Sequence, residues 1–268
     1  MAKRKKRDIP IKTEEQIRKM RIAGQLASEV LQETAKAVKV GATTGEIDGL
    51  AAELVAQRDA TATFLGYRGF PGTICISVNE EVVHGIGGDR KIQPGDLVSI
   101  DIGVTKDGWI GDNALTVPVG PISEEAKKLL VATEESLFQA IEYAREGELL
   151  ANLCGSVEAY VRQYGFTVVR DLVGHGVGSE LHEKPEVPNY RPDFRTPKLK
   201  AGMILAIEPM VNAGVGSVKW LDDGWTVVTS DGKPSAHFEH TVLVTDGDPE
   251  ILTMRPRTAL PEQLGVVM

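Results

Sequence analysis

The stretch DLVSIDIGVTKDGWIGDNALTV, residues 96–117, decides the fold of this chain. Two runs rich in β-forming residues flank the turn signal Lys-Asp-Gly at 106–108, which predicts an antiparallel hairpin. Apolar residues alternate with small or polar ones along the first run, so only one face suits a core. Asp101 and Asp112 lie inside the two runs, where aspartate is normally rare. The second face therefore carries carboxylates that need a physical reason.

The turn decides how these two aspartates meet. If Lys106 and Asp107 form a two-residue loop, Asp101 and Asp112 lie directly opposite each other. If Asp107 and Gly108 form it, the two aspartates lie diagonally on one face. Only a loop of odd length puts them on different faces. Two carboxylates about 5 Å apart destabilise a fold unless one is protonated or a cation lies between them.

Helices and strands are expected on both sides of this hairpin. Capping-box patterns at Thr13-x-x-Gln16 and Thr43-x-x-Glu46 predict two helix starts, and Gly41 is the predicted stop of the first helix. Two more helices are expected over 123–144 and about 153–164. Strands are expected over 73–78, 166–172, 203–208, 224–229 and 237–244. No long linker separates these elements, so a single domain is expected.

The second half of the chain resembles the first. KIQPGDLVSID (91–101) aligns with KLKAGMILAIE (198–208) at an offset of 107 residues. GATTGEIDGLAAELVAQ (41–57) aligns with GELLANLCGSVEAYVRQ (147–163) at an offset of 106 residues. Chance similarity of helix and strand patterns is the alternative. The alignment of Asp101 with Glu208, an acid with an acid inside an apolar strand, favours an internal repeat.

Two more acids and a histidine share this unusual setting. Glu208 ends the apolar run MILAIE, Glu239 lies in AHFEHTVLV, and His175 lies among glycines in LVGHGVG. A single acid in a strand usually faces solvent, but four such acids favour one common site. Four carboxylates and a neutral imidazole balance two divalent cations such as Mn²⁺, Fe²⁺, Co²⁺ or Zn²⁺, among which the sequence does not choose. A single metal or a structural Ca²⁺ site is the alternative, although the D-x-[DN]-x-[DN]-G loop is absent.

Composition narrows the classes of function. The 268 residues contain no apolar run of about 18 residues and no signal-peptide core, so a cytoplasmic protein without a membrane segment is expected. Cys75 and Cys154 lie far apart, which fits a reducing compartment. Five of the 30 Lys and Arg residues lie in MAKRKKR (1–7), so the rest of the chain has 25 Lys and Arg residues and 38 Asp and Glu residues. This acidic body argues against DNA binding, whereas the basic tail is either solvated or a contact for ribosomal RNA.

The ordered series Asp101, Asp112, His175, Glu208 and Glu239 resembles the metal-ligand set of the pita-bread metallopeptidases. The strings SIDIG, GDNALT, GHGVG, IEPM, FEHT, NEEVVHGI and DGWTVVTSDG resemble bacterial type I methionine aminopeptidases in particular. This resemblance covers residues 13–255. It implies an α+β pita-bread fold, in which a curved, antiparallel-rich sheet is covered by helices, with pseudo-two-fold halves at about 13–120 and 121–250. Residues 1–12 would form a basic flexible tail and residues 256–268 a C-terminal tail.

The resemblance also implies an activity and a set of roles. A monomeric enzyme with two divalent metal ions would remove the N-terminal methionine from nascent polypeptides that have a small second residue. Asp112 and Glu239 would bridge the metals, Asp101 would complete one of them, and His175 and Glu208 would complete the other. Hydroxide held by the metals would attack the first peptide carbonyl.

Catalytic and substrate-binding residues follow from the same strings. Glu208 would move the proton, and His84 and His182 would steady the substrate and the tetrahedral intermediate. His237 and His240 are expected to be structural. Phe64 and Leu181 depart from the enteric-type pattern, where a cysteine and a phenylalanine are usual. The implied pocket for methionine consists of Phe64, Tyr67, Phe70, Cys75, His84, Leu181, His182 and Trp225.

Two other functions fit the same residues. One is an aminopeptidase of the same fold that releases a residue preceding proline. The other is a non-catalytic binding protein with this fold, although such relatives typically lose metal ligands. Metal-dependent release of methionine from a short peptide separates all three.

Overall fold

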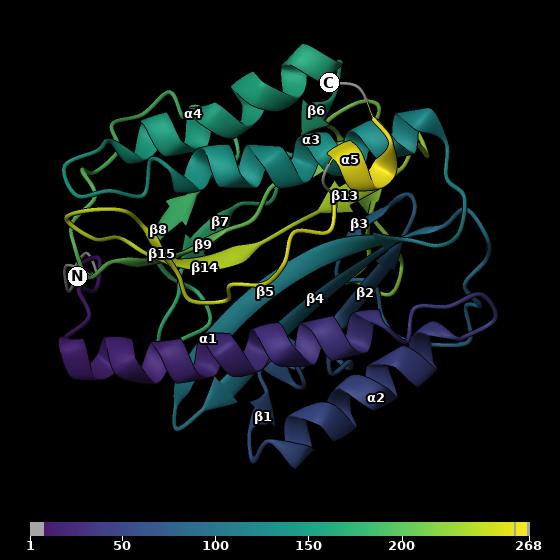
Figure 1. Ribbon diagram of the computed structural model, residues 1–268, viewed down its shortest axis with the longest axis horizontal. Helices are drawn as coiled ribbons and strands as arrows, with labels where there is room; N and C mark the ends of the chain where they lie inside the picture. The colour runs from purple at the N-terminus through teal and green to yellow at the C-terminus, as the bar shows by residue number, and fades with distance from the viewer. Residues whose placement is uncertain (1–7, 260, 267–268) are drawn as a thin grey trace, which may run out of the picture.

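The computed structural model describes residues 8–259 and 261–266, and its helices lie on two opposite sides of a central set of strands (Figure 1). Helices α1 (Glu14–Ala35) and α2 (Thr44–Gln57) cover one side, and α3 (Glu124–Ile141) and α4 (Leu150–Val161) cover the other. The remaining helical elements are short: η1 (Tyr67–Gly69), η2 (Arg162–Tyr164) and α5 (Pro261–Leu264). Among the described residues, no helix is both long enough and apolar enough to span a bilayer.

Within the described residues, the strands form four small sheets whose paired strands all run antiparallel. The first contains β1 (Thr61–Ala62), β2 (Cys75–Val78), β4 (Leu97–Lys106) and β5 (Trp109–Pro118). The second, in the order β15-β14-β9-β7-β8, contains β15 (Glu250–Ile251), β14 (His240–Leu243), β9 (Ile204–Ile207), β7 (Gly174–Gly176) and β8 (Glu183–Val187). The third contains β13 (Ser235–His237), β10 (Met210–Asn212) and β6 (Thr167–Val168). The fourth contains β11 (Val218–Trp220), β12 (Val227–Thr229) and β3 (Glu81–Val83).

The predicted hairpin is formed by β4 and β5, with Asp107 and Gly108 as its loop. Their φ angles are 49° and 78°, as a type I′ turn requires, and Lys106 pairs with Trp109 on either side of the loop. Asp112 consequently lies opposite Gly103, two positions along β4 from Asp101. The diagonal arrangement is therefore the correct one of the two registers that the sequence allows.

Both predicted helix starts are confirmed, but the predicted stop of the first helix is wrong. Thr13 and Thr43 cap α1 and α2 through complete capping boxes. Helix α1 ends at Ala35, six residues before Gly41, because the next amides turn back to carbonyls only three residues earlier, as in Val38 N–H to Ala35. Gly41, with φ of 90°, instead donates its N–H to the Ile92 carbonyl and so connects the loop to the segment that precedes β4.

The internal repeat is confirmed at the level of single backbone contacts. Thr43 forms an isolated antiparallel bridge with Lys91, and Leu149 forms the corresponding bridge with Lys198. The glycines that precede β4 and β9 both have positive φ. Matching features, given as first half then second half, are Gly41 with Gly147 (φ 90° and 88°) and Gly95 with Gly202 (φ 93° and 87°). The offsets of 106 and 107 residues are those found in the sequence.

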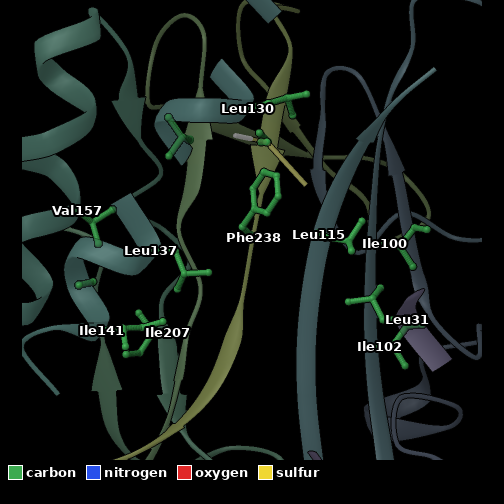
Figure 2. Packing of buried hydrophobic residues seen from close by; sticks show 14 of the residues in the cluster. Leu31, Ile100, Ile102, Leu115, Leu130, Leu137, Ile141, Val157, Ile207 and Phe238 are labelled. Atoms are coloured by element: carbon green, nitrogen blue, oxygen red, sulfur yellow. The ribbon is translucent and has the colours of Figure 1, made fainter. Parts of the chain in front are cut away.

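One hydrophobic core joins the two halves. It includes Leu31 of α1, Ile100 of β4 and Leu115 of β5 together with residues of α3, α4 and β9. Figure 2 shows Phe238, which is fully buried, between Ile207 of the second half and Leu115 of the first. Because these side chains pack as one cluster, the two halves cannot shift without disturbing the space between them.

The predicted strand 237–244 is wrong at its centre, where the chain changes sheets. Strand β13 ends at His237 and β14 begins at His240. Phe238 donates its N–H to Pro209 O (3.3 Å), and Glu239 donates its N–H to Ala114 O in β5 (2.9 Å). On the segment that pairs with it, β9 ends at Ile207 and β10 begins at Met210. Glu208 and Glu239 therefore lie on two antiparallel segments, each at the point where its segment passes from one sheet into another.

The ends of the described chain contact its body. Residues 1–7, the basic part of the predicted tail, lie outside the described residues. Lys12 is only 8% exposed and donates its N–H to Gly202 O (2.8 Å). At the other end, Thr258 and Ala259 donate their N–H groups to the buried carboxylate of Glu134 on α3.

Candidate metal centre

Three carboxylates from both halves meet beside the β4–β5 hairpin. One ligand oxygen from each of Asp101, Asp112 and Glu239 lies within 4.8 Å of those of the other two. Strands β4 and β5 supply the two aspartates, and the sheet change after β13 supplies Glu239. Asp101 Oδ1, Asp112 Oδ1 and Glu239 Oε1 are buried and accept no hydrogen bond. Buried oxygens of this kind fit a divalent cation as their missing partner.

His175 and Glu208 extend this cluster on one side. His175 Nε2 lies 3.4 Å from Glu208 Oε1 and 3.9 Å from Asp112 Oδ2. The other ring nitrogen, Nδ1, lies 3.0 Å from the Gly176 carbonyl, to which it can only donate. This bond leaves Nε2 as a lone-pair donor directed at the carboxylates, which is the tautomer a metal ligand needs.

The electrostatics of the site also favour a bound cation when the acids are ionised. Burial raises the pKa of Asp112 to about 7. Burial and repulsion between neighbouring carboxylates raise the pKa values of Asp101, Glu208 and Glu239 well above the ordinary range. Burial lowers the pKa of His175 to about 3, so this imidazole is neutral. A bound divalent cation reverses the penalty on the ionised carboxylates. These residues therefore fit the oxygen-rich set, with one imidazole, that suits a divalent transition metal.

Backbone contacts hold the acids in place across the two halves. Thr241 Oγ1 donates to Asp112 O (2.7 Å) and accepts the Asp112 N–H (3.1 Å). The buried guanidinium of Arg255 donates to Ala114 O (2.6 Å) and to Glu239 O (3.1 Å). Thr241 and Arg255 thus connect β5 of the first half to the chain around Glu239.

Two further histidines border the acids. His84 has a left-handed backbone with φ of 60°, which is unusual for a residue other than glycine and is typical of functional sites. His182 forms a 2.8 Å hydrogen bond through Nδ1 with the Tyr67 hydroxyl, and its ring centroid lies 4.2 Å from that of His175. Burial lowers the pKa of His182 to about 4 and that of His84 below its ordinary value. Both imidazoles are therefore neutral hydrogen-bonding groups.

Apolar and aromatic side chains form the wall next to the acids. Phe64, Phe70, Cys75 and Leu181 are buried in one hydrophobic cluster, against which Tyr67 and Trp225 pack. The Phe70 and Trp225 rings meet edge to face with centroids 5.2 Å apart. Burial and the nearby carboxylates raise the pKa of Cys75, so its thiol stays neutral. This wall suits a flexible, sulfur-containing apolar side chain.

A cavity of about 250 Å³ brings together all thirteen residues that the sequence singled out. It joins the acids and histidines to the apolar wall. His240 lies outside the lining and hydrogen-bonds to Thr253 (2.9 Å), as a structural histidine does. His237, also expected to be structural, lines the cavity with Nε2 3.9 Å from Glu208 Oε2. No local pattern in the sequence distinguishes it, because the strand ends at His237 and two-residue alternation does not continue to Glu239. The other lining residues that sequence reasoning missed are Arg68, Val83, Leu172, Val173 and Met210.

Comparison with known proteins agrees with this geometry. The family profile described as Metallopeptidase family M24 matches residues 18–246. Methionine aminopeptidase 1 of Bacillus subtilis is 50% identical over 242 residues, which cover 90% of this chain and 98% of that protein. Methionine aminopeptidase of Clostridium perfringens is 51% identical over 92% of this chain and 99% of that protein. A crystal structure of methionine aminopeptidase from Rickettsia prowazekii superimposes with a TM-score of 0.90 at 39% identity, covering 92% of this chain and all of that one.

These matches span both halves and the cavity between them. They confirm the predicted pita-bread fold with its pseudo-two-fold halves. Residues 18–246 contain all five expected metal ligands, and the acid cluster has the buried oxygens that a divalent metal needs. The chain belongs to Metallopeptidase family M24.

Proposed function

We propose that this protein is a metal-dependent aminopeptidase that removes the N-terminal methionine from nascent polypeptides with a small second residue. One observation carries the proposal: a single cavity joins five candidate metal ligands to an aromatic, apolar pocket. Relatives with that activity in their names are about half identical to this chain over nearly their whole length. Its site of action is proposed to be the cytoplasm.

The metal ligands are proposed to be Asp101, Asp112, His175, Glu208 and Glu239, which would hold two divalent ions. When bound, the ions supply charge stabilisation at the reacting carbonyl and a water of lowered pKa. Glu208, at the edge of the acids next to His175, would hold and transfer a proton. His84 and His182, both neutral, would donate hydrogen bonds to the substrate carbonyl as charge develops on its oxygen.

The apolar wall would select methionine. Phe70 and Trp225 place ring edges and faces where a thioether gains contacts with aromatic groups. Phe64 and Leu181, the two departures from the enteric-type pattern, are both buried in this wall, where they would shape it. A charged or large polar first residue would lose its hydration there without a partner, so it would be rejected.

The test is release of methionine from Met-Ala-Ser by the purified protein with added divalent metal. We expect release that stops when a chelator is added and returns with metal, and little release from the matched peptide Lys-Ala-Ser. Asp101→Asn should abolish release, whereas Asp107→Asn, at the exposed turn of the same hairpin, should not. Metal-independent release, or equal release of the first residue of Ala-Pro-Ser, contradicts the proposal.

A further inference from the structure

A second, larger groove meets the catalytic cavity at its mouth. It has a volume of about 780 Å³ and is lined on one side by Asp8, Pro10 and Ile11 and on the other by Ser179, Glu180 and Glu186. Arg68, Val173, His175 and His182 line both spaces, so the groove lies directly beside the cavity there. The cavity of about 250 Å³ is smaller than most ligand pockets, which hold about 300–1,000 Å³. A longer peptide that places its first residue in the cavity must therefore leave it, and the groove is the neighbouring space with room for the rest of the chain.

The two walls of the groove are joined by one buried ion pair. The Lys12 ammonium contacts Glu183 Oε2, and the two side chains are only 5% and 9% exposed. Hydrogen bonds hold the backbone of Lys12 in place. Its N–H donates to Gly202 O (2.8 Å), and the Gly202 N–H in turn donates to Val244 O (3.0 Å). The N-terminal wall is thus anchored to the second half of the molecule.

Glu183 fixes the opposite wall. Its Oε1 accepts the N–H groups of Ser179 (3.1 Å) and Glu180 (3.4 Å) and so closes the loop between β7 and β8. A Cβ on Gly178 would overlap both the Glu183 carboxylate and the Lys12 ammonium, so the pair packs directly on the loop backbone. This loop carries Leu181 and His182, which line the catalytic cavity. The ion pair therefore acts on both the groove and the residues at its inner end.

We propose that the groove binds the extended polypeptide that follows the cleaved bond, and that the Lys12–Glu183 pair sets the spacing of its walls. This inference rests on the proposed function and adds a substrate-binding region to it. The walls carry both signs of charge, and Lys184 pairs with Glu186 across 3.1 Å. Substrate length, rather than the charge of its side chains, is therefore the property that the groove recognises. Lys12 is a positioning residue, since it acts through Glu183 and the loop.

Kinetics with two neutral substrates test this. The metal-loaded protein is given Met-Ala-amide or Met-Ala-Ser-Gly-Ser-amide, and kcat and KM for methionine release are compared. We expect the longer peptide to have a KM lower by about tenfold, because remote contacts add binding energy. Lys12→Met should remove most of this advantage by raising the KM of the longer peptide, and Lys12→Arg should restore it. Lys19→Met, which removes an exposed pair with Glu15 on α1, should leave it unchanged.

A cross-link gives a second readout that needs no variant and no turnover. The metal-loaded protein is irradiated with Met-Ala-Ser bearing a photoreactive phenylalanine at position four and a reduced first peptide bond. We expect adducts in 8–16 or 179–186. Equal KM values for the two substrates in the wild-type protein, or adducts only elsewhere, would contradict substrate binding in the groove. An unchanged length advantage in Lys12→Met would overturn the role of the ion pair. If neither substrate is cleaved, the proposed function fails, and the cross-link alone decides the groove.

Discussion

At the scale of single residues, the buried acids act against the stability of the metal-free protein. Asp101 Oδ1 has no hydrogen-bond partner, and the neighbouring Asp112 repels it. We predict that Asp101→Asn abolishes methionine release and yet raises the unfolding midpoint of the metal-free protein, because an amide does not have to be protonated, or buried as a charge, when the chain folds. Thermal unfolding in chelator, with Asp107→Asn as the control, measures this. A lower midpoint for Asp101→Asn than for Asp107→Asn would contradict it.

The same acids give the metal-free protein a defined pH dependence. A carboxyl group whose pKa is raised in the folded state stabilises the fold at low pH and loses that contribution as pH rises through the raised value. The histidines, whose pKa values are lowered, oppose this only below about pH 6.5, since above it they are neutral in both states.

We therefore predict that the free energy of unfolding in chelator falls between pH 6.5 and pH 8. The loss is about 2 kcal/mol for each carboxyl group that stays protonated in the fold over this window. Urea unfolding at the two pH values measures it, and saturating metal should remove the dependence. Constant or rising stability in chelator would show that the acids are ionised without a partner.

Sequence reasoning works well for these residues, since an acid inside an apolar strand conflicts with ordinary strand chemistry. Asp101 and Asp112 could be placed on one face from the hairpin alone. His237 could not be assigned to the cavity, because a histidine in a strand has many satisfactory environments. Only the unpartnered Nε2 atom in the folded structure distinguishes it.

At the scale of elements, the turn of the hairpin fixes which face of β5 carries Asp112. We predict that Gly108→Ala costs about 1 kcal/mol of unfolding free energy, because the alanine must adopt φ of 78°. Gly49→Ala, in the middle of α2, should instead stabilise by about 0.5–1 kcal/mol. A Cβ meets no atom within 4 Å at either site, so only the backbone differs. Urea unfolding of both variants tests this, and equal effects would contradict it.

Element boundaries follow from sequence only where the signal is local. The capping boxes of α1 and α2 are local patterns, and both were predicted correctly. The break between β13 and β14 is not local, since Phe238 and Glu239 bond to Pro209 and to Ala114 on distant segments. The apolar run 237–244 therefore predicts one strand, although the chain passes from one sheet to another within it.

At the scale of the whole molecule, the candidate metal centre lies between two halves that one core and a few polar contacts hold together. The repeat could be found from sequence because it preserves glycines and an acid at a constant offset. The contact made by Arg255 could not, because it lies outside both repeats and its partners are backbone carbonyls. Its buried guanidinium joins Ala114 O of the first half to Glu239 O of the second.

We predict that Arg255→Met lowers the free energy of unfolding by about 1–3 kcal/mol, since it removes the donor to the buried Glu239 carbonyl, whereas Ala114 O keeps the Glu239 N–H as a donor. It should also weaken divalent-metal binding, because the backbone of Glu239 then keeps only its own N–H bond to Ala114 O as a connection to β5. Arg145→Met is the matched control: Arg145 bonds to Asp248 (2.8 Å) and Glu142 (2.9 Å) at the surface, where such pairs contribute little. Urea unfolding in chelator and calorimetric titration with Mn²⁺ measure the two effects separately. If Arg255→Met were less stable but bound metal as tightly as Arg145→Met, Arg255 would join the halves without positioning Glu239.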